Sequence, residues 1–157
     1  MPPVGQHCTS SDSDSAGATS VYLASRFARR EELRQVAREL EACGYEVTSR
    51  WLDSYDALAP DELDPDGRAA ALAAMDLEDV RRASICVAFT EDASQVKPGR
   101  GGRHTELGIA LALGLRVVLV GPREHVFHCL PDITQFGSWR EARQTLFASA
   151  SENVAVA

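Results

Sequence analysis

The segment 101–114 reads GGRHTELGIALALG and combines a glycine-rich turn, one acidic residue and an apolar helix. Leucine and isoleucine alternate with alanine after Glu106, and Gly114 is a typical helix end, so the pattern predicts a buried helix. Upstream, the apolar run ASICVAFT at residues 83–90 predicts a strand buried on both faces of a parallel sheet. Glu106 should therefore lie beyond the carboxyl end of a strand, in or near the first turn of a helix, where open α/β sheets bind ligands.

A helix start favours negative charge. We therefore expect Glu106 to be ionised and available as a nucleophile or base, unless burial raises its pKa. The alternative is a first-turn glutamate that only complements the helix dipole.

The composition fits one soluble domain. The 157 residues are 45% hydrophobic, which is enough for one compact core. A net charge of -7 argues against a protein that coats nucleic acid. No stretch approaches the roughly 18 to 20 apolar residues of a membrane span, and the N-terminus lacks a basic or apolar leader. None of the four cysteines forms a close pair such as CxxC, so we expect reduced thiols and a cytoplasmic protein.

The chain divides into a domain and two tails. Residues 1–19 are polar and serine-rich, which predicts a disordered tail, and residues 151–157 are expected to be loose. Residues 20–150 are expected to form a single domain.

Strand and helix patterns alternate within this domain. The predicted strands are 21–24, 45–52, 83–90 and 116–120, and the predicted helices are 29–43, 68–82, 107–113 and a short one from about Trp139. The polar connection 53–67 is too long for an ordinary loop and is interpreted as a lid or substrate loop. With right-handed crossovers, this order predicts an α/β fold: a Rossmann-like parallel sheet sandwiched by helices, in flavodoxin-like strand order. The dinucleotide fingerprint G-x-G-x-x-G is absent from the first turn, where ASRF stands at 24–27, so a nicotinamide dehydrogenase is disfavoured.

Three short motifs resemble the nucleoside 2-deoxyribosyltransferase family, which includes the 2'-deoxynucleoside 5'-monophosphate N-glycosidases. They are Tyr22 in VYLASRF, Asp76 in MDLEDVRRAS and Glu106 in GGRHTELGIALALG, and the resemblance spans about residues 21–120. It implies that Glu106 attacks the anomeric carbon and forms a glycosyl-enzyme, that Asp76 moves the proton of the departing base, and that Tyr22 orients Glu106. It also implies a homodimer or larger oligomer and no cofactor.

The chemistry of glycosidic cleavage agrees with this resemblance. An oxocarbenium-like transition state is served by one ionised and one protonated carboxyl group, and covalent catalysis divides the displacement into two easier steps. Without the resemblance, Asp76 would be interpreted as a solvated helix residue, and Tyr22 as a strand aromatic in the core.

Further candidates surround these three residues. Ser25 matches a phosphate-binding serine of the monophosphate N-glycosidases, and glycines before a helix let backbone amides approach an anion. The proposed substrate-binding residues are Ser25, Arg26, Gly101, Gly102, Arg103 and His104. The expected partner is a small-molecule nucleoside or nucleotide. The cations before Glu106 have two alternative interpretations, as a solvated loop or as contacts to the nucleobase.

The histidines raise the question of a metal. His104, His125 and His128 show neither H-E-x-x-H nor a Cys/His ligand spacing, so no metal is expected.

Two other functions compete. The segment 98–106, PGRGGRHTE, resembles the PGGxGTxxE loop of the lysine-decarboxylase-like phosphoribohydrolases. A non-catalytic nucleotide sensor with the same fold is the other alternative, although the joint presence of Asp76 and Glu106 argues against it. Hydrolysis and transfer both fit the main hypothesis, because they share the covalent step.

Overall fold

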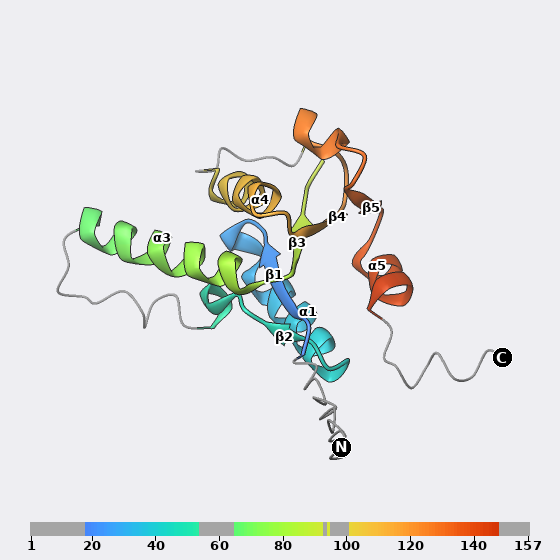
Figure 1. Ribbon diagram of the computed structural model, residues 1–157, viewed down its shortest axis with the longest axis horizontal. Coiled ribbons are helices and arrows are strands. Elements are labelled where there is room, and N and C mark those ends of the chain that lie inside the picture. Colours follow the sequence, from blue (N-terminus) through green and yellow to red (C-terminus); the bar gives the residue numbers. More distant parts are fainter. Residues whose placement is uncertain (1–17, 54–64, 93, 95–100, 148–157) are drawn as a thin grey trace, which may run out of the picture.

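The computed structural model describes residues 18–53, 65–92, 94 and 101–147. Figure 1 labels their elements, which form one parallel sheet in the order β2-β1-β3-β4-β5. The strands are β1 (Ser20–Ala24), β2 (Glu46–Val47), β3 (Ile85–Phe89), β4 (Arg116–Val120) and β5 (Thr134–Phe136). The helices are α1 (Arg30–Ala42), α3 (Pro65–Arg82), α4 (Gly102–Ala112) and α5 (Trp139–Leu146), with the 3-10 turns η1 (Phe27–Arg29), η2 (Arg50–Leu52) and η4 (Val126–Cys129). The predicted Rossmann-like class and flavodoxin-like strand order are confirmed.

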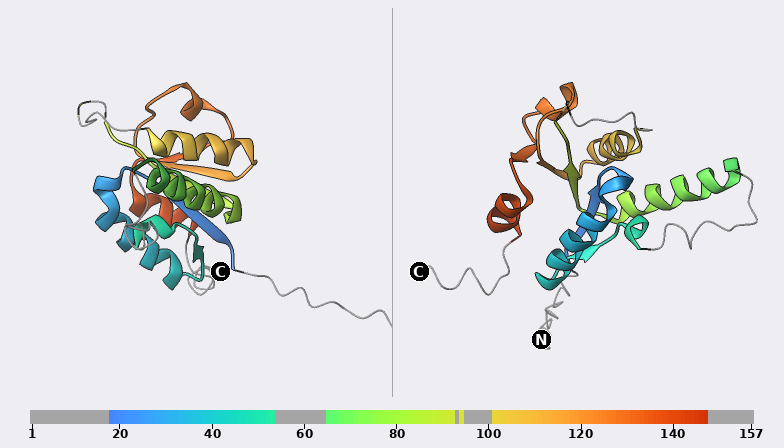
Figure 2. Two further views of the ribbon diagram at one scale, coloured as in Figure 1. Left: turned by 90° about the vertical axis from the view of Figure 1, so that its left-hand side faces the viewer. Right: turned by 180° about the vertical axis from the view of Figure 1, so that it is seen from behind.

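Helices cover both faces of the sheet. Helices α3 and α4 pack together on one face, while α1 and α5 lie on the other, as Figures 1 and 2 show from three directions. The indole Nε1 of Trp139 joins the second pair by donating to Glu39 Oε2 at 2.7 Å. Strand β3 lies between these layers, and all five of its residues are buried, as its apolar run predicts.

The strand register decides which side chains reach the α3/α4 face. Tyr22 of β1 pairs with Cys86 of β3, which pairs with Val117 of β4. Because side chains alternate along a strand, Tyr22 and Cys86 point to the same face, and neighbouring residues such as Phe89 point to the other. Strands β1 and β3 are neighbours in the sheet. The chain passes from β1 to β2 on one side and from β3 to β4 on the other, so the carboxyl ends of β1 and β3 flank the topological switch point.

Several element boundaries differ from the predictions. The second strand is limited to Glu46–Val47, since Arg50–Leu52 forms the 3-10 turn η2, in which Trp51 and Leu52 are buried. Strand β5 was missed because it has three residues, of which two are exposed and polar. Helix α3 begins at Pro65, within the expected 53–67 connection, and residues 54–64 of that connection lie outside the described residues. Most of the predicted tail 1–19 and all of the predicted tail 151–157 also lie outside them.

In the described part of the chain, no helix has the length and apolar character that a membrane crossing requires.

Candidate active site

Tyr22, Asp76 and Glu106 come together from β1, α3 and α4. Tyr22 is completely buried on the α3/α4 face. Burial, followed by the charges of Glu106 and Asp76, raises its pKa well above the ordinary value. These mutual effects connect the three side chains that the sequence motifs singled out, and they keep the Tyr22 hydroxyl protonated beside two carboxyl groups.

Glu106 does not behave as its position in the sequence suggested. Helix α4 begins at Gly102, so Glu106 stands in the second turn, beyond the strongest influence of the helix dipole. Burial raises its pKa to about 8, and the nearby Asp76 adds to this shift. The exception named for the ionised Glu106 therefore applies to the substrate-free site, because burial raises its pKa and outweighs the helix dipole.

Asp76 titrates below Glu106. Burial raises its pKa to about 6, the charge of Asp79 acts in the same direction, and Arg50 acts against both. Between pH about 6 and about 8 the two carboxyl groups therefore hold one proton together. A pair with one proton is what acid-assisted nucleophilic cleavage needs.

Four buried oxygen atoms of the proposed site residues have no hydrogen-bond partner in the described part of the chain. They are Tyr22 Oη, Ser25 Oγ, Asp76 Oδ1 and Glu106 Oε2. The Tyr22 hydroxyl still lowers the pKa of Glu106 as a nearby donor, but the contact falls outside full hydrogen-bond geometry. Buried polar atoms are normally satisfied, so this group marks a place where a polar ligand gains hydrogen bonds.

The glycine turn borders the same region. Gly101 adopts a φ of 75°, a left-handed conformation that favours glycine, and starts α4. A Cβ placed on Gly102 would lie 3.8 Å from Glu106 Oε1, so the turn runs directly beside the carboxyl group. The cations and the glycine at 97–100, which precede this turn in the sequence, lie outside the described residues.

The predicted cationic contacts are engaged in ion pairs. Arg26 donates to Glu91 Oε2 at 2.5 Å, and Arg103 donates to Glu124 Oε1 at 3.0 Å. His104 turns toward His125, with their Nδ1 and Nε2 atoms 3.1 Å apart. These three candidates therefore have protein partners, while Ser25 keeps an unpartnered hydroxyl.

Sequence reasoning missed Asp79 and Arg50. Asp79 is completely buried and follows Asp76 by three residues, a spacing that puts both on one side of α3. Its Oδ1 and Oδ2 accept from the Nε and the backbone N of Arg50 at 2.7 and 2.9 Å. The i, i+3 pair of acids in MDLEDV was the available signal, whereas the contact with Arg50 arises only on folding.

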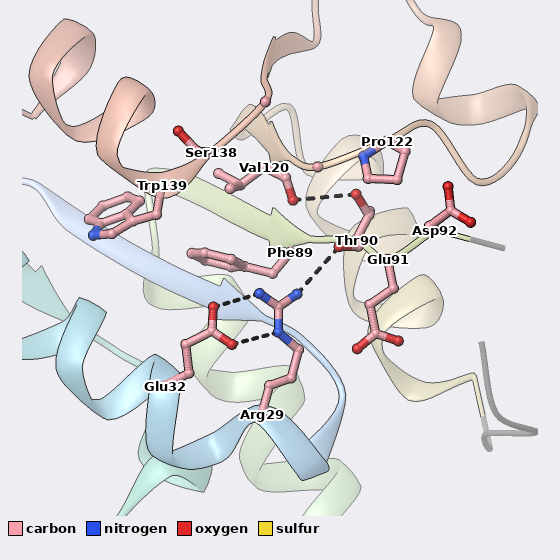
Figure 3. Close-up of a pocket in the computed structure, with 12 residues that line it drawn as sticks. Arg29, Glu32, Phe89, Thr90, Glu91, Asp92, Val120, Pro122, Ser138 and Trp139 are labelled. Carbon is pink, nitrogen blue, oxygen red and sulfur yellow. Dashed lines mark hydrogen bonds and ion pairs between the residues drawn. The ribbon is translucent and has the colours of Figure 1, made fainter. Parts of the chain in front are cut away.

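A cavity of about 580 Å³ opens elsewhere on the carboxyl edge (Figure 3). Its walls include Phe89, Thr90 and Trp139, and none of the three candidate catalytic residues. Arg29 crosses it and donates to both oxygens of Glu32 and to Thr90 O, so its charge is already compensated. The carboxyl pair is the stronger candidate site, because it combines raised carboxyl pKa values with unpartnered buried oxygens.

Comparison with known proteins identifies related folds. No protein-family model matches the chain, and no curated protein matches it in sequence. One similar solved structure is the CMP N-glycosidase BcmB of Clostridium botulinum, at 20% identity and a TM-score of 0.53, over 82% of this chain and 98% of that one. Another is a 2-deoxyribosyltransferase from the psychrotolerant bacterium Bacillus psychrosaccharolyticus, at 20% identity and a TM-score of 0.58, over 79% of this chain and 90% of that one. Both names agree with the family that the sequence motifs resemble, and the likeness establishes that the chain has their fold.

Proposed function

We propose that this protein cleaves the N-glycosidic bond of a nucleoside or a nucleoside 5'-monophosphate. The observation that carries this proposal is the convergence of Tyr22, Asp76 and Glu106, with one unpartnered buried oxygen on each. The two similar folds support it, since their names describe a CMP N-glycosidase and a 2-deoxyribosyltransferase.

In the proposed reaction, a Glu106 oxygen forms a bond to the anomeric carbon as the bond from that carbon to the base nitrogen breaks. The electron pair of the broken bond leaves with the base, and Asp76 donates a proton to it. Water or a second base then attacks the anomeric carbon of the glycosyl ester, the bond from that carbon to the Glu106 oxygen breaks, and its electron pair restores the carboxylate. Asp76 accepts the proton that the attacking group loses. Water gives the free sugar or its 5'-phosphate, and a second base gives a new nucleoside or nucleotide.

The proton has to change places before this step. In the substrate-free site the higher pKa belongs to Glu106, so the shared proton rests there at neutral pH. The productive form carries the proton on Asp76 and the charge on Glu106. Tyr22 favours that form, because its hydroxyl lowers the pKa of Glu106. We therefore assign Tyr22 the role of supporting the ionised nucleophile.

The 5' end of the substrate is assigned to Ser25 and the glycine turn. The Ser25 hydroxyl is buried and unpartnered in the described part of the chain, and the start of α4 supplies backbone N–H groups. Arg26 and Arg103 are paired with carboxylates, so a phosphate would compete with Glu91 and Glu124 for them. Between the two substrate classes we propose the 5'-monophosphate, with Ser25 as its anchor.

The proposed assembly is a homodimer or a larger homo-oligomer. The turn η4 exposes Val126 and Phe127 by 78% and 60%, and Leu130 follows at 41%. Exposed apolar residues grouped in this way are typical of a protein contact.

The decisive experiment measures base release by chromatography from ribo- and deoxyribonucleosides and their 5'-monophosphates, with and without a second free base. Release from monophosphates alone indicates a nucleotide N-hydrolase, and new nucleoside formed only with the acceptor base indicates a transferase. Glu106→Gln and Asp76→Asn should each lower kcat by at least about 100-fold, since each removes a group that acts in the transition state.

Matched controls separate chemistry from folding. Glu31→Gln and Asp132→Asn change exposed carboxylates and should leave turnover unchanged. Substrate binding without turnover by the unaltered protein would overturn the catalytic proposal in favour of the nucleotide sensor.

A further inference from the structure

Folding gathers three of the four histidines of the chain at one place. His104 belongs to the first turn of α4, while His125 and His128 flank and occupy η4. One ring nitrogen from each lies within 4.8 Å of the others. No regular spacing in the sequence announces this group, because 21 residues separate the first two members.

The closest pair already has the separation that one metal ion requires. His104 Nδ1 and His125 Nε2 are 3.1 Å apart. Two nitrogens bound to the same ion at about 2.0 to 2.1 Å lie about 3.0 to 3.4 Å apart for angles from octahedral to tetrahedral. The third imidazole would have to move inward by about 1 to 2 Å to complete such a set.

The surroundings of the cluster supply what metal-binding histidines use. The Glu124 carboxylate lies 3.8 Å from His104 Nε2, the nitrogen that stays protonated when Nδ1 is a ligand. Carboxylates in this position orient the ligand ring. In the described part of the chain, His125 Nδ1 is buried without a hydrogen-bond partner, and Glu124 Oε2 has the ion pair with Arg103 at 3.0 Å.

Two features limit the affinity. His128 Nδ1 accepts from the backbone N of Glu124 at 3.0 Å, and an ion has to displace this bond or bind the other nitrogen after a proton shift. Arg103 is also close, with its Nη2 3.5 Å from His104 Nε2, although Glu124 compensates its charge. An ion that overcomes both features has to bind imidazole strongly. Transition-metal ions do so, whereas Mg²⁺ and Ca²⁺ prefer oxygen ligands.

We propose that His104, His125 and His128 bind one divalent transition-metal ion, for which Zn²⁺ is the reference. The ion would connect η4 to the first turn of α4 at His104, two residues before Glu106. Three protein ligands leave one position of a tetrahedral ion for water or another small ligand. The site is separate from the carboxyl pair and does not depend on the proposed reaction.

Metal titration of the full chain, after treatment with a chelator, tests this proposal. Co²⁺ should give a visible absorption band that saturates at one equivalent, and Zn²⁺ should abolish it and raise the thermal midpoint. His104→Ala and His125→Ala change partly exposed rings and should each weaken Zn²⁺ binding by at least tenfold in calorimetry. Glu124→Gln should weaken it by about 10- to 100-fold.

His7→Ala is the matched control, because it removes the remaining histidine of the chain, and it should leave Zn²⁺ binding unchanged. His128→Asn serves only as a supporting variant, since this buried ring also holds the turn. Equal Zn²⁺ affinity in the unaltered protein and in the His104→Ala/His125→Ala double variant would overturn the proposal, and so would the absence of saturable binding.

Discussion

At the scale of single residues, burial affects the pKa values of the carboxyl pair more than neighbouring charges do. Desolvation is the largest influence on the pKa of both Asp76 and Glu106, and it places them at about 6 and about 8. Because the pKa of Glu106 lies above that of Asp76, the form with the proton on Asp76 and the charge on Glu106 is the less populated of the two one-proton forms. Any group that changes the pKa of Asp76 therefore changes the population of the productive form.

Asp79 is the residue best placed to do so. Removal of its charge by Asp79→Asn leaves Arg50 to lower the pKa of Asp76 further. Below the pKa of Asp76 both carboxyl groups are protonated and no nucleophile remains, so activity falls as the pH drops through about 6. In Asp79→Asn we expect the acid limb of the profile of kcat/KM against pH to move to lower pH, with a smaller plateau.

Glu78→Gln is the control for this prediction. Glu78 lies next to Asp79 and pairs with the same Arg50 at 2.5 Å, but it is exposed. The charges that affect Asp76 come from Asp79 and Arg50, while Glu106 and Tyr22 respond to Asp76 in turn. An acid limb that stays in place in Asp79→Asn, with the fold intact by circular dichroism, would contradict the role of Asp79.

At the scale of elements, the strands and helices with long apolar patterns could be predicted from the sequence, and the short elements could not. The sheet order and the position of Glu106 could be predicted from the buried runs of β3 and β4 and from the small-residue pattern of α4. Strand β2 ends after two residues, because the backbone then enters the turn η2. The N–H of Leu23 in β1 donates to the side-chain oxygen of Ser49, at 2.7 Å, and not to a further residue of β2. Contacts of this kind, like the pairing of Asp79 with Arg50, join distant residues and leave no periodic signal.

The same limit applies to the candidate site. Tyr22, Asp76 and Glu106 could be named from motifs because their roles depend on residue type and order. The pKa of Glu106 could not be predicted, since it depends on how deeply α4 packs onto the sheet. The partners of Arg26, Arg103 and His104 likewise come from other elements.

The carboxyl edge of the sheet depends on one glycine. Gly121 follows β4 at a φ of 118°, and a Cβ on it would lie 2.6 Å from Thr90 Oγ1 and 2.8 Å from Thr90 O. Its N–H donates to Phe136 O at 2.9 Å, so it cannot move away without loosening β5. We expect Gly121→Ala to lower the free energy of unfolding by about 1 to 3 kcal/mol or more, measured by urea denaturation.

Gly108→Ala gives the opposite sign and serves as the control. Gly108 lies within α4, and a Cβ there meets no described atom within 4 Å. Replacing a helical glycine by alanine should stabilise the protein by about 0.5 to 1 kcal/mol. A Gly121→Ala protein as stable as the unaltered one would contradict the close contact between Gly121 and Thr90 on which this prediction depends.

At the scale of the whole molecule, the turn η4 carries exposed apolar side chains, Val126 and Phe127. Turn η4 stands beyond the carboxyl ends of β3 and β4, next to the start of α4 (Figure 1). A partner that covers Val126 and Phe127 would therefore approach the edge where the carboxyl pair and the glycine turn lie. An assembly through this turn and a complete substrate pocket are consequently linked in our proposal.

This link predicts that oligomeric state and activity change together. Light scattering after size-exclusion chromatography should give the mass of a dimer or larger assembly for the unaltered protein. Phe127→Ser should shift the mass toward the monomer, because it removes an aromatic ring that is 60% exposed in the isolated chain. Leu113→Ser changes a 50% exposed apolar residue at the other end of α4 and should leave the mass unchanged. A monomeric Phe127→Ser protein that keeps full base-release activity would separate assembly from catalysis, and a fully active monomer of the unaltered chain would remove the basis for the proposed assembly.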